Sequence, residues 1–302
     1  GLVGLFAAGG MTQAVAQGGE AATGQSAIDE IIVTALKREG QSLLDAPAAI
    51  SVITGTEIDE MGADSLQDFL QLAPSVSIDR SFEAGTTNIQ IRGVSATFGA
   101  ASVGFYLDDL PFSLVNFNFL PDPAPYDLES IEVLKGPQGA LYGAGSSGGV
   151  VLVRTKDPVM NELSGKLDVS GSNTDDGSNN YSTSGSFNLP LIDDVLAVRG
   201  SVSYQDNSGW IDDTINLSDT DINGEQRLNG RIKLLAQPSQ ELSISLLGVF
   251  SRYENDFGID VSDNEANYPQ SFFGFEALGE DARSSRDYDQ FGSVITYEFE
   301  SF

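Results

Sequence analysis

The side chains that most often carry catalysis are missing from this chain. Its 302 residues include no Cys and no His, which excludes disulfides, thiolate or imidazole metal ligands, and catalytic triads built on either residue. Paired carboxylates are plentiful, but they lie in no motif. With 15 Lys and Arg against 44 Asp and Glu, the net charge of −29 repels nucleic acid. We therefore expect no enzyme, no cofactor, no metal site and no nucleic-acid partner.

One short segment has the chemistry of backbone pairing. Ile28–Ala35 (IDEIIVTA) is apolar and β-prone, and it lies alone between the Gly- and Ala-rich residues 17–27 and the charged residues 37–39. An isolated strand leaves its N–H and C=O groups open to a strand from another chain. The alternative is that this segment forms the first strand of the domain that follows.

Residues 131–149 (IEVLKGPQGALYGAGSSGG) form a long glycine-rich pattern. Some glycine-rich loops cradle phosphate groups, but these residues do not fit GxxxxGK[ST] and no Lys follows the last glycine. We expect tight turns between two strands instead.

The N-terminus has the pattern of an export signal. The first ten residues are apolar and small, and Ala14 and Ala16 supply the small residues that precede a cleavage site. We expect residues 1–16 to be a signal-peptide remnant and residues 17–40 to be a flexible segment that carries the pairing strand. A disordered tail is the alternative.

The elements that must position these segments divide the chain in two. Residues 41–158 predict a compact α+β unit, in which Thr54 or Thr56 caps one helix and Pro74 ends another, at 65–72. Short β-prone runs predict strands at residues 50–53, 88–92, 103–107, 130–134 and 150–154.

From residue 163 onward, apolar and polar residues alternate as they do in strands with one apolar face. Six runs show this pattern, at residues 166–170, 181–189, 196–204, 227–234, 242–251 and 291–299. Their connections at 190–194 and 237–240 are short, whereas 172–180, 205–226 and 254–287 are predicted to be long, acidic loops. Aromatic residues fall near the strand ends, where the outward-facing aromatic girdles of membrane barrels lie, namely Tyr181, Tyr204, Trp210, Phe250 and Tyr253.

This alternation of short and long connections is typical of outer-membrane barrels, and a soluble antiparallel sandwich is the alternative. Six strands do not close a membrane barrel, and open strand edges are not tolerated in lipid. We therefore expect the intact protein to be longer.

Four stretches resemble one family, the TonB-dependent outer-membrane receptors. Ile28–Ala35 resembles the TonB box, Asn88–Val94 (NIQIRGV) resembles a strand that ends in Ile-Arg-Gly, and Val150–Pro158 resembles the family's exit strand. Ile131–Gly149 is close to the plug signature Val-Glu-Val-Leu-Arg-Gly-Pro-Gln-Gly-x-Leu-Tyr-Gly. The resemblance implies an α+β plug domain over residues 41–158, then antiparallel transmembrane β-barrel strands over 163–302, in the bacterial outer membrane.

Two positions depart from the family pattern. Asp108-Asp109-Leu110-Pro111 stands where many members have Asp-Gly-Val-Pro, so we expect that turn to be built differently. Lys135 stands where Arg is commoner, which keeps the charge and loses the bidentate geometry.

The resemblance also implies a partner and its binding site. The periplasmic energy-transducing protein TonB would add a strand to the released TonB box. Its binding residues would be Ile28, Asp29, Glu30, Ile31, Ile32, Val33, Thr34 and Ala35.

Apical plug loops are the implied place for the solute. Arg80, Phe82, Phe98 and Phe117 are candidates for binding it through charge and aromatic stacking, with packing against the barrel as the alternative. Arg92 and Lys135 are candidates for plug–barrel ion pairs with acids of later strands, with local salt bridges in the plug as the alternative.

The implied function is active uptake of a small-molecule solute, a ferric siderophore, by a receptor embedded in outer-membrane lipid. Carbohydrate, polyphenol and cobalamin uptake are alternatives within the same family. A non-transporting adhesin or structural barrel is the alternative from another class, which the plug signature disfavours.

Overall fold

A computed structural model describes residues 32–33, 41–42, 49–62, 65–80, 87–96, 101–112, 124–175, 177–210, 212–213, 224–255, 271–272 and 284–297. All of them belong to one unit of contacts that spans residues 32–302. No helix in these ranges has the length and hydropathy that a membrane crossing demands. The expected signal-peptide remnant, residues 1–16, lies outside the described residues.

The first sheet belongs to the plug, a name used here for residues 49–158. Its strands follow the order β3-β8-β9-β6-β7, in which β6 runs parallel to β9 and the other neighbours are antiparallel. A smaller sheet pairs β4 with β5. The bounds are β3 Ala49–Thr54, β4 Val76–Arg80, β5 Thr87–Ile91, β6 Val103–Leu107, β7 Leu110–Phe112, β8 Leu128–Lys135 and β9 Gly149–Thr155. The strands predicted from the β-prone runs are confirmed.

Reciprocal side-chain caps begin two plug helices. α1 (Gly55–Met61) starts at Thr54, whose hydroxyl accepts from the Glu57 amide at 3.4 Å while the Glu57 carboxylate accepts from the Thr54 amide at 2.8 Å. α2 (Leu66–Leu70) starts in the same way at Ser65. Such caps satisfy amides that the first helical turn leaves without partners. A third helix, α3 (Gly139–Tyr142), lies in the glycine-rich stretch.

The centre of the plug sheet is buried on both faces. Successive residues of β9, Val150 to Val153, are at most 1% exposed, so neither face of this strand meets solvent. Phe69 of α2 and Phe105 of β6 are buried to the same degree. Each such side chain contributes about 1.5–3 kcal/mol on burial.

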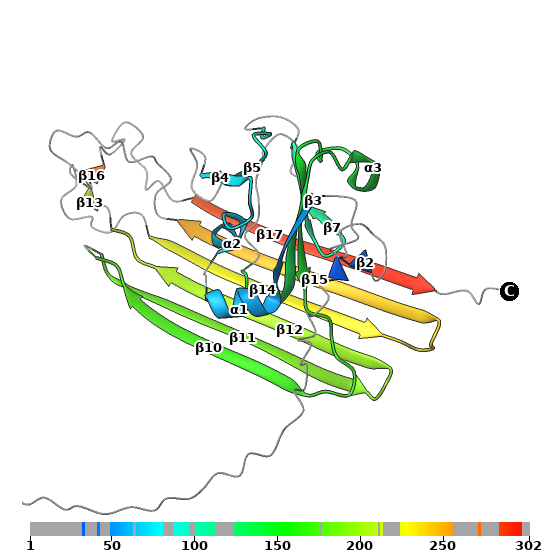
Figure 1. Ribbon diagram of the computed structural model, residues 1–302. Helices are drawn as coiled ribbons and strands as arrows, with labels where there is room; N and C mark the ends of the chain where they lie inside the picture. The colour runs from blue at the N-terminus through cyan, green and yellow to red at the C-terminus, as the bar shows by residue number, and fades with distance from the viewer. Residues whose placement is uncertain are drawn as a thin grey trace, which may run out of the picture. The chain divides into compact units, whose positions relative to one another are not determined.

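The second sheet, here called the wall, is an antiparallel meander of six long strands in the order β10-β11-β12-β14-β15-β17 (Figure 1). Among the described strands, β10 and β17 form its two edges. The bounds are β10 Ser164–Asn173, β11 Asn179–Ile192, β12 Leu196–Asn207, β14 Glu225–Ala236, β15 Leu242–Asn255 and β17 Ser284–Tyr297. Two short strands, β13 (Asp212–Asp213) and β16 (Ser271–Phe272), pair with each other.

Each wall strand has one apolar and one polar face. On the outer face, Leu167 and Val169 are both 72% exposed and Phe291 is 83% exposed. On the inner face, Ser203 and Asn229 are buried. An apolar outer face and a polar inner face are what a barrel wall presents to lipid and to its lumen.

One predicted loop is wrong. Residues 172–180 do not form a long connection, because β10 continues to Asn173 and β11 already begins at Asn179. Polar side chains extend this ladder, and Asn173 Nδ2 donates to Asn179 Oδ1 at 3.3 Å. Alternation does not reveal such strand ends, because both faces can be polar once the strand has left the lipid.

Tyr253 also departs from its expected place among the outer aromatics. It faces inward on β15, where its ring lies 5.5 Å from the Arg227 guanidinium and its hydroxyl donates to Glu225 at 3.3 Å.

Candidate functional site

Three cations from the two central strands of the wall, β12 and β14, contact the plug from the inner face. Arg199 comes from β12, and Arg231 and Lys233 come from alternate positions of β14. A cation in an interface shielded from water needs carboxylates or carbonyl oxygens around it. Their partners therefore show which plug segments the wall holds.

Arg199 binds the plug segment that precedes β8. Its Nε donates to Asp127 Oδ2 at 2.8 Å, and its Nη2 donates to the other carboxylate oxygen. The Arg199 and Asp127 side chains are only 15% and 7% exposed. Two parallel hydrogen bonds of this kind fix orientation as well as distance.

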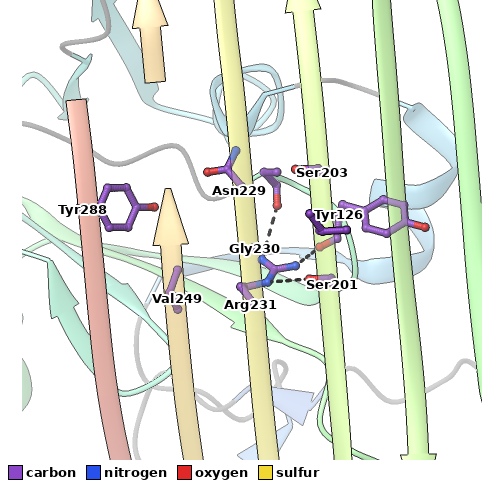
Figure 2. A pocket seen from close by; sticks show the side chains of 10 residues that line it. Tyr126, Ser201, Ser203, Asn229, Gly230, Arg231, Val249 and Tyr288 are labelled. Atoms are coloured by element: carbon purple, nitrogen blue, oxygen red, sulfur yellow. Dashed lines mark hydrogen bonds between the residues drawn. The ribbon is translucent and has the colours of Figure 1, made fainter. Parts of the chain in front are cut away.

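Arg231 binds backbone carbonyls of the same plug segment. Figure 2 shows its guanidinium directed at the Tyr126 carbonyl oxygen, while its Nε donates to Ser201 Oγ at 3.2 Å. Its Nη1 also lies 3.5 Å from the carbonyl oxygen of Ala124. Arg231 thus supplies donors to the backbone of the plug, where buried carbonyls require partners.

Lys233 binds the turn after β6. Its Nζ lies 3.2 Å from Asp108 Oδ2 and 3.3 Å from Thr155 Oγ1, and it also pairs with Asp157. The Thr155 amide and hydroxyl donate to Asp108 at 2.9 and 2.8 Å. The turn after β6 thus places Asp108 beside a wall cation, with a φ of 51° at Asp108.

Two neighbouring wall strands meet the plug through apolar contacts. Leu247 and Val249 of β15, 7% and 4% exposed, belong to the same core cluster as the plug residues. The Leu110 side chain lies against Gly292 of β17, where any Cβ would collide with it. Gln290 donates to the Pro111 carbonyl oxygen at 3.4 Å. The hydrophobic core of the plug is thus completed by the wall.

A cavity of about 10 Å³ lies beside Arg231, between the wall and Tyr126 (Figure 2). Ser203 and Asn229 line it, and Asn229 Oδ1 has no hydrogen-bond partner within the described part of the chain. The space and the acceptor suit one water molecule.

Arg92 and Lys135, the predicted plug–barrel residues, lie close together in the plug. Lys135 ends β8, and exposed Arg92 follows β5 with a φ of 52°. Burial, and then the positive charge of Arg92, lower the pKa of Lys135. The structure thus shows two neighbouring cations. Their pairing with acids of later strands stays a prediction.

The other predicted residues are described only in part. Arg80 ends β4, but its side chain and all of Phe82, Phe98 and Phe117 lie outside the described residues. Of the predicted TonB box, Ile32–Val33 forms β1 and pairs antiparallel with β2 (Gln41–Ser42). The described ranges contain no group of three or more acidic, His or Cys side chains placed to hold a metal ion.

The wall cations were not among the predicted site residues, although β14 carries a signal for them. Its inner-face positions read Glu225, Arg227, Asn229, Arg231 and Lys233, so four of these five alternate positions carry a charge. A charged face on a strand whose other face is apolar indicates that something polar lies across the lumen. The identity of that partner depends on how the plug docks.

Comparison with known proteins gives concordant results. A family model described as TonB-dependent Receptor Plug Domain matches residues 42–150. The pesticin receptor of Yersinia pestis is 26% identical over 223 residues, which cover 73% of this chain and 32% of that receptor. The probable TonB-dependent siderophore receptor PirA of Acinetobacter baumannii is 31% identical over 194 residues, or 57% of this chain and 24% of that protein.

A solved structure shares the fold. The ferric yersiniabactin uptake receptor FyuA from Yersinia pestis superposes with a TM-score of 0.70 at 20% identity, over 85% of this chain and 39% of that one. The chain thus spans about a third of the length of the curated relatives that it matches first.

Proposed function

We propose that this chain, whose residues 42–150 match the TonB-dependent receptor plug domain, forms the gated part of an outer-membrane uptake receptor for a ferric siderophore. The solute would bind from outside, and TonB would engage Ile28–Ala35 from the periplasm to drive import. The siderophore assignment draws on two relatives, PirA, which is described as a probable siderophore receptor, and FyuA, which is described as a ferric yersiniabactin uptake receptor. The name of the pesticin receptor refers to neither.

The anchored plug is the observation that carries this proposal. Arg199, Arg231 and Lys233 fasten the plug to the inner face of the wall, and the core of the plug extends onto β15. A folded domain fixed inside a barrel obstructs passive flow. Moving it requires work, which an outer membrane without ATP must receive from elsewhere.

The pairing strand supports the TonB assignment. Ile32–Val33 is extended and pairs with Gln41–Ser42 along one edge. A strand that already accepts one partner in β geometry is suited to strand addition, in which backbone hydrogen bonds give affinity.

Proline substitution in the pairing strand tests the function. Ile31→Pro and Val33→Pro each remove a backbone donor, so we expect TonB-dependent uptake to be abolished while folding and solute binding at the surface persist. Uptake should be measured in iron-starved cells that carry the full receptor. The separate probes are ferric yersiniabactin, ferripyoverdine and ferric enterobactin labelled with radioactive iron, and cyanocobalamin labelled with radioactive cobalt.

The matched control is Ile31→Val, which keeps both the amide and the β propensity and should import normally. Full uptake by the proline variants would defeat the TonB assignment. If cyanocobalamin is imported and none of the iron complexes is, the solute is cobalamin and not a ferric siderophore.

A further inference from the structure

The plug and the wall are separated by a hollow on one side. A cavity of about 300 Å³ lies between the inner faces of β10, β11 and β12 and the plug residues of α1 and 124–126. It is far larger than the water-sized cavity beside Arg231, of about 10 Å³. Its wall side is built largely from short polar residues, Ser170, Ser182, Ser184 and Ser203.

The wall side of this hollow is mainly polar, whereas Ile58 and Pro125 line its plug side. Each serine hydroxyl both donates and accepts hydrogen bonds. Lys166 reaches across it, with Nζ at 5.4 Å from the centre of the Tyr126 ring and at 3.4 Å from Asp59 on α1. A surface of hydroxyls, one aromatic ring and paired charges suits a hydrated solute that carries hydroxyl or amide groups and disfavours an apolar one.

The contacts that cross the hollow are weak. Asp59 pairs with Lys166 at 3.4 Å and with Lys156 at 3.5 Å, and the three side chains are between 36% and 51% exposed. Exposed ion pairs of this kind contribute little, because water already solvates both charges. Little free energy therefore holds α1 to β10.

The contacts beyond the hollow are strong by comparison. Arg199 and Asp127 form a shielded bidentate pair, and Arg231 donates to plug carbonyls. Leu247 and Val249 then lie in the plug core. Residues 124–127 stand at the boundary, since Ala124 and Tyr126 line the hollow and also accept from Arg231.

From this asymmetry we infer that the plug parts from the wall at the β10–β12 hollow, turning about residues 124–127, and that the widened hollow is the passage for a polar, hydroxyl-bearing solute. This inference rests on the proposed uptake function and adds the side of the plug on which passage occurs.

Thiol labelling in the full receptor tests the passage. This chain has no Cys, so Ser184→Cys places a near-isosteric thiol in the hollow, and Ser201→Cys places one beneath Arg231 as the matched control. Living cells are treated with a small, charged methanethiosulfonate reagent, with and without TonB. We expect Ser184→Cys to react at least about tenfold faster than Ser201→Cys, which corresponds to about 1.4 kcal/mol of easier opening.

The Ser184→Cys rate should rise further when TonB is present, and the Ser201→Cys rate should not change. Equal rates at the two positions, or a faster rate at Ser201→Cys, would overturn the inference. A Ser184→Cys rate that does not respond to TonB would also overturn it, because the hollow would then be static.

A cross-linking experiment examines the same point by transport. Asp59→Cys with Lys166→Cys, joined by a reducible bis-methanethiosulfonate reagent, should block uptake of the radiolabelled iron complexes until the link is reduced. Leu110→Cys with Gly292→Cys, joined in the same way on the apolar side, should leave uptake unchanged. The reverse result, or block by both links, contradicts the inference.

The two experiments separate this inference from the proposed function. Absence of uptake by the unmodified receptor would defeat the proposed function. Thiol labelling requires no transported solute, so its two rates would still test the inference.

Discussion

The plug sheet and the wall sheet use apolar side chains in opposite ways. In the plug, Val153 of β9 is fully buried, whereas in the wall, Leu167 of β10 is 72% exposed. Both are aliphatic residues in strands, and the difference lies in the medium around them. The plug needs a core of its own, and the wall leaves its apolar face to lipid.

The same substitution should therefore have different costs in the two sheets. The plug is packed on both faces and has little room to relax. The outer face of the wall meets fluid lipid, into which a displaced side chain can move. Packing changes should therefore affect the plug first.

A glycine-to-alanine pair gives the largest expected difference. In the plug, Gly149 has a φ of 154°, and a Cβ there would collide with the Leu134 carbonyl oxygen and lie 2.8 Å from Ile91. Gly149→Ala should cost about 3 kcal/mol or more, because backbone strain adds to overpacking. Calorimetric melting of the full receptor in detergent would measure it.

Gly200→Ala is the matched change in the wall. Its Cβ would meet the Phe187 ring at 2.5 Å, but that ring is the far end of an exposed side chain and can move into lipid. We expect a cost below about 1 kcal/mol. Equal costs at the two glycines would remove the distinction between the sheets.

The sequence predicts each sheet well because each one obeys a local rule. The helix face of Leu66, Phe69 and Leu70 and the alternation of β14 both follow from the spacing of neighbouring residues. The end of β10 escapes that rule, because Asn173 and Asn179 pair through polar side chains where alternation has ceased.

The interface between the sheets is predicted poorly, and the reason is also physical. Asp127 and Arg199 are 72 positions apart, and nothing in the spacing of either segment specifies the other. The sequence points to cations on the plug, at Arg92 and Lys135, and their pairing with later strands stays a prediction. The described interface adds cations on the wall that pair with acids on the plug. Such pairing is set by docking of the finished sheets.

The two faces of the wall should also differ in their effect on the plug. Arg231→Met should remove the donors to the Tyr126 and Ala124 carbonyls and destabilise the docked plug by about 1–3 kcal/mol. The plug transition in urea, followed in the detergent-solubilised receptor, would report this loss.

The control is Arg252→Met on the outer face, where Arg252 pairs with Asp289 at 3.0 Å in an exposed position. It should leave the plug transition unchanged, because the pair does not contact the plug. If both changes loosen the plug equally, the inner-face cations do not anchor it.

Alkaline pH should act on the plug with a smaller effect. Burial raises the pKa of Tyr142 to about 12, against an ordinary value near 10, so the folded plug holds this proton more tightly than the unfolded chain. Its contribution to stability is complete below pH 10 and is lost as the pH rises through 12. At pH 11 the loss should be about 1.4 kcal/mol, and Tyr142→Phe should remove it. Melting the plug at pH 9 and pH 11, in both proteins, measures this difference. An identical pH response in the Phe variant would mean that the alkaline sensitivity arises from other groups and not from the burial of Tyr142.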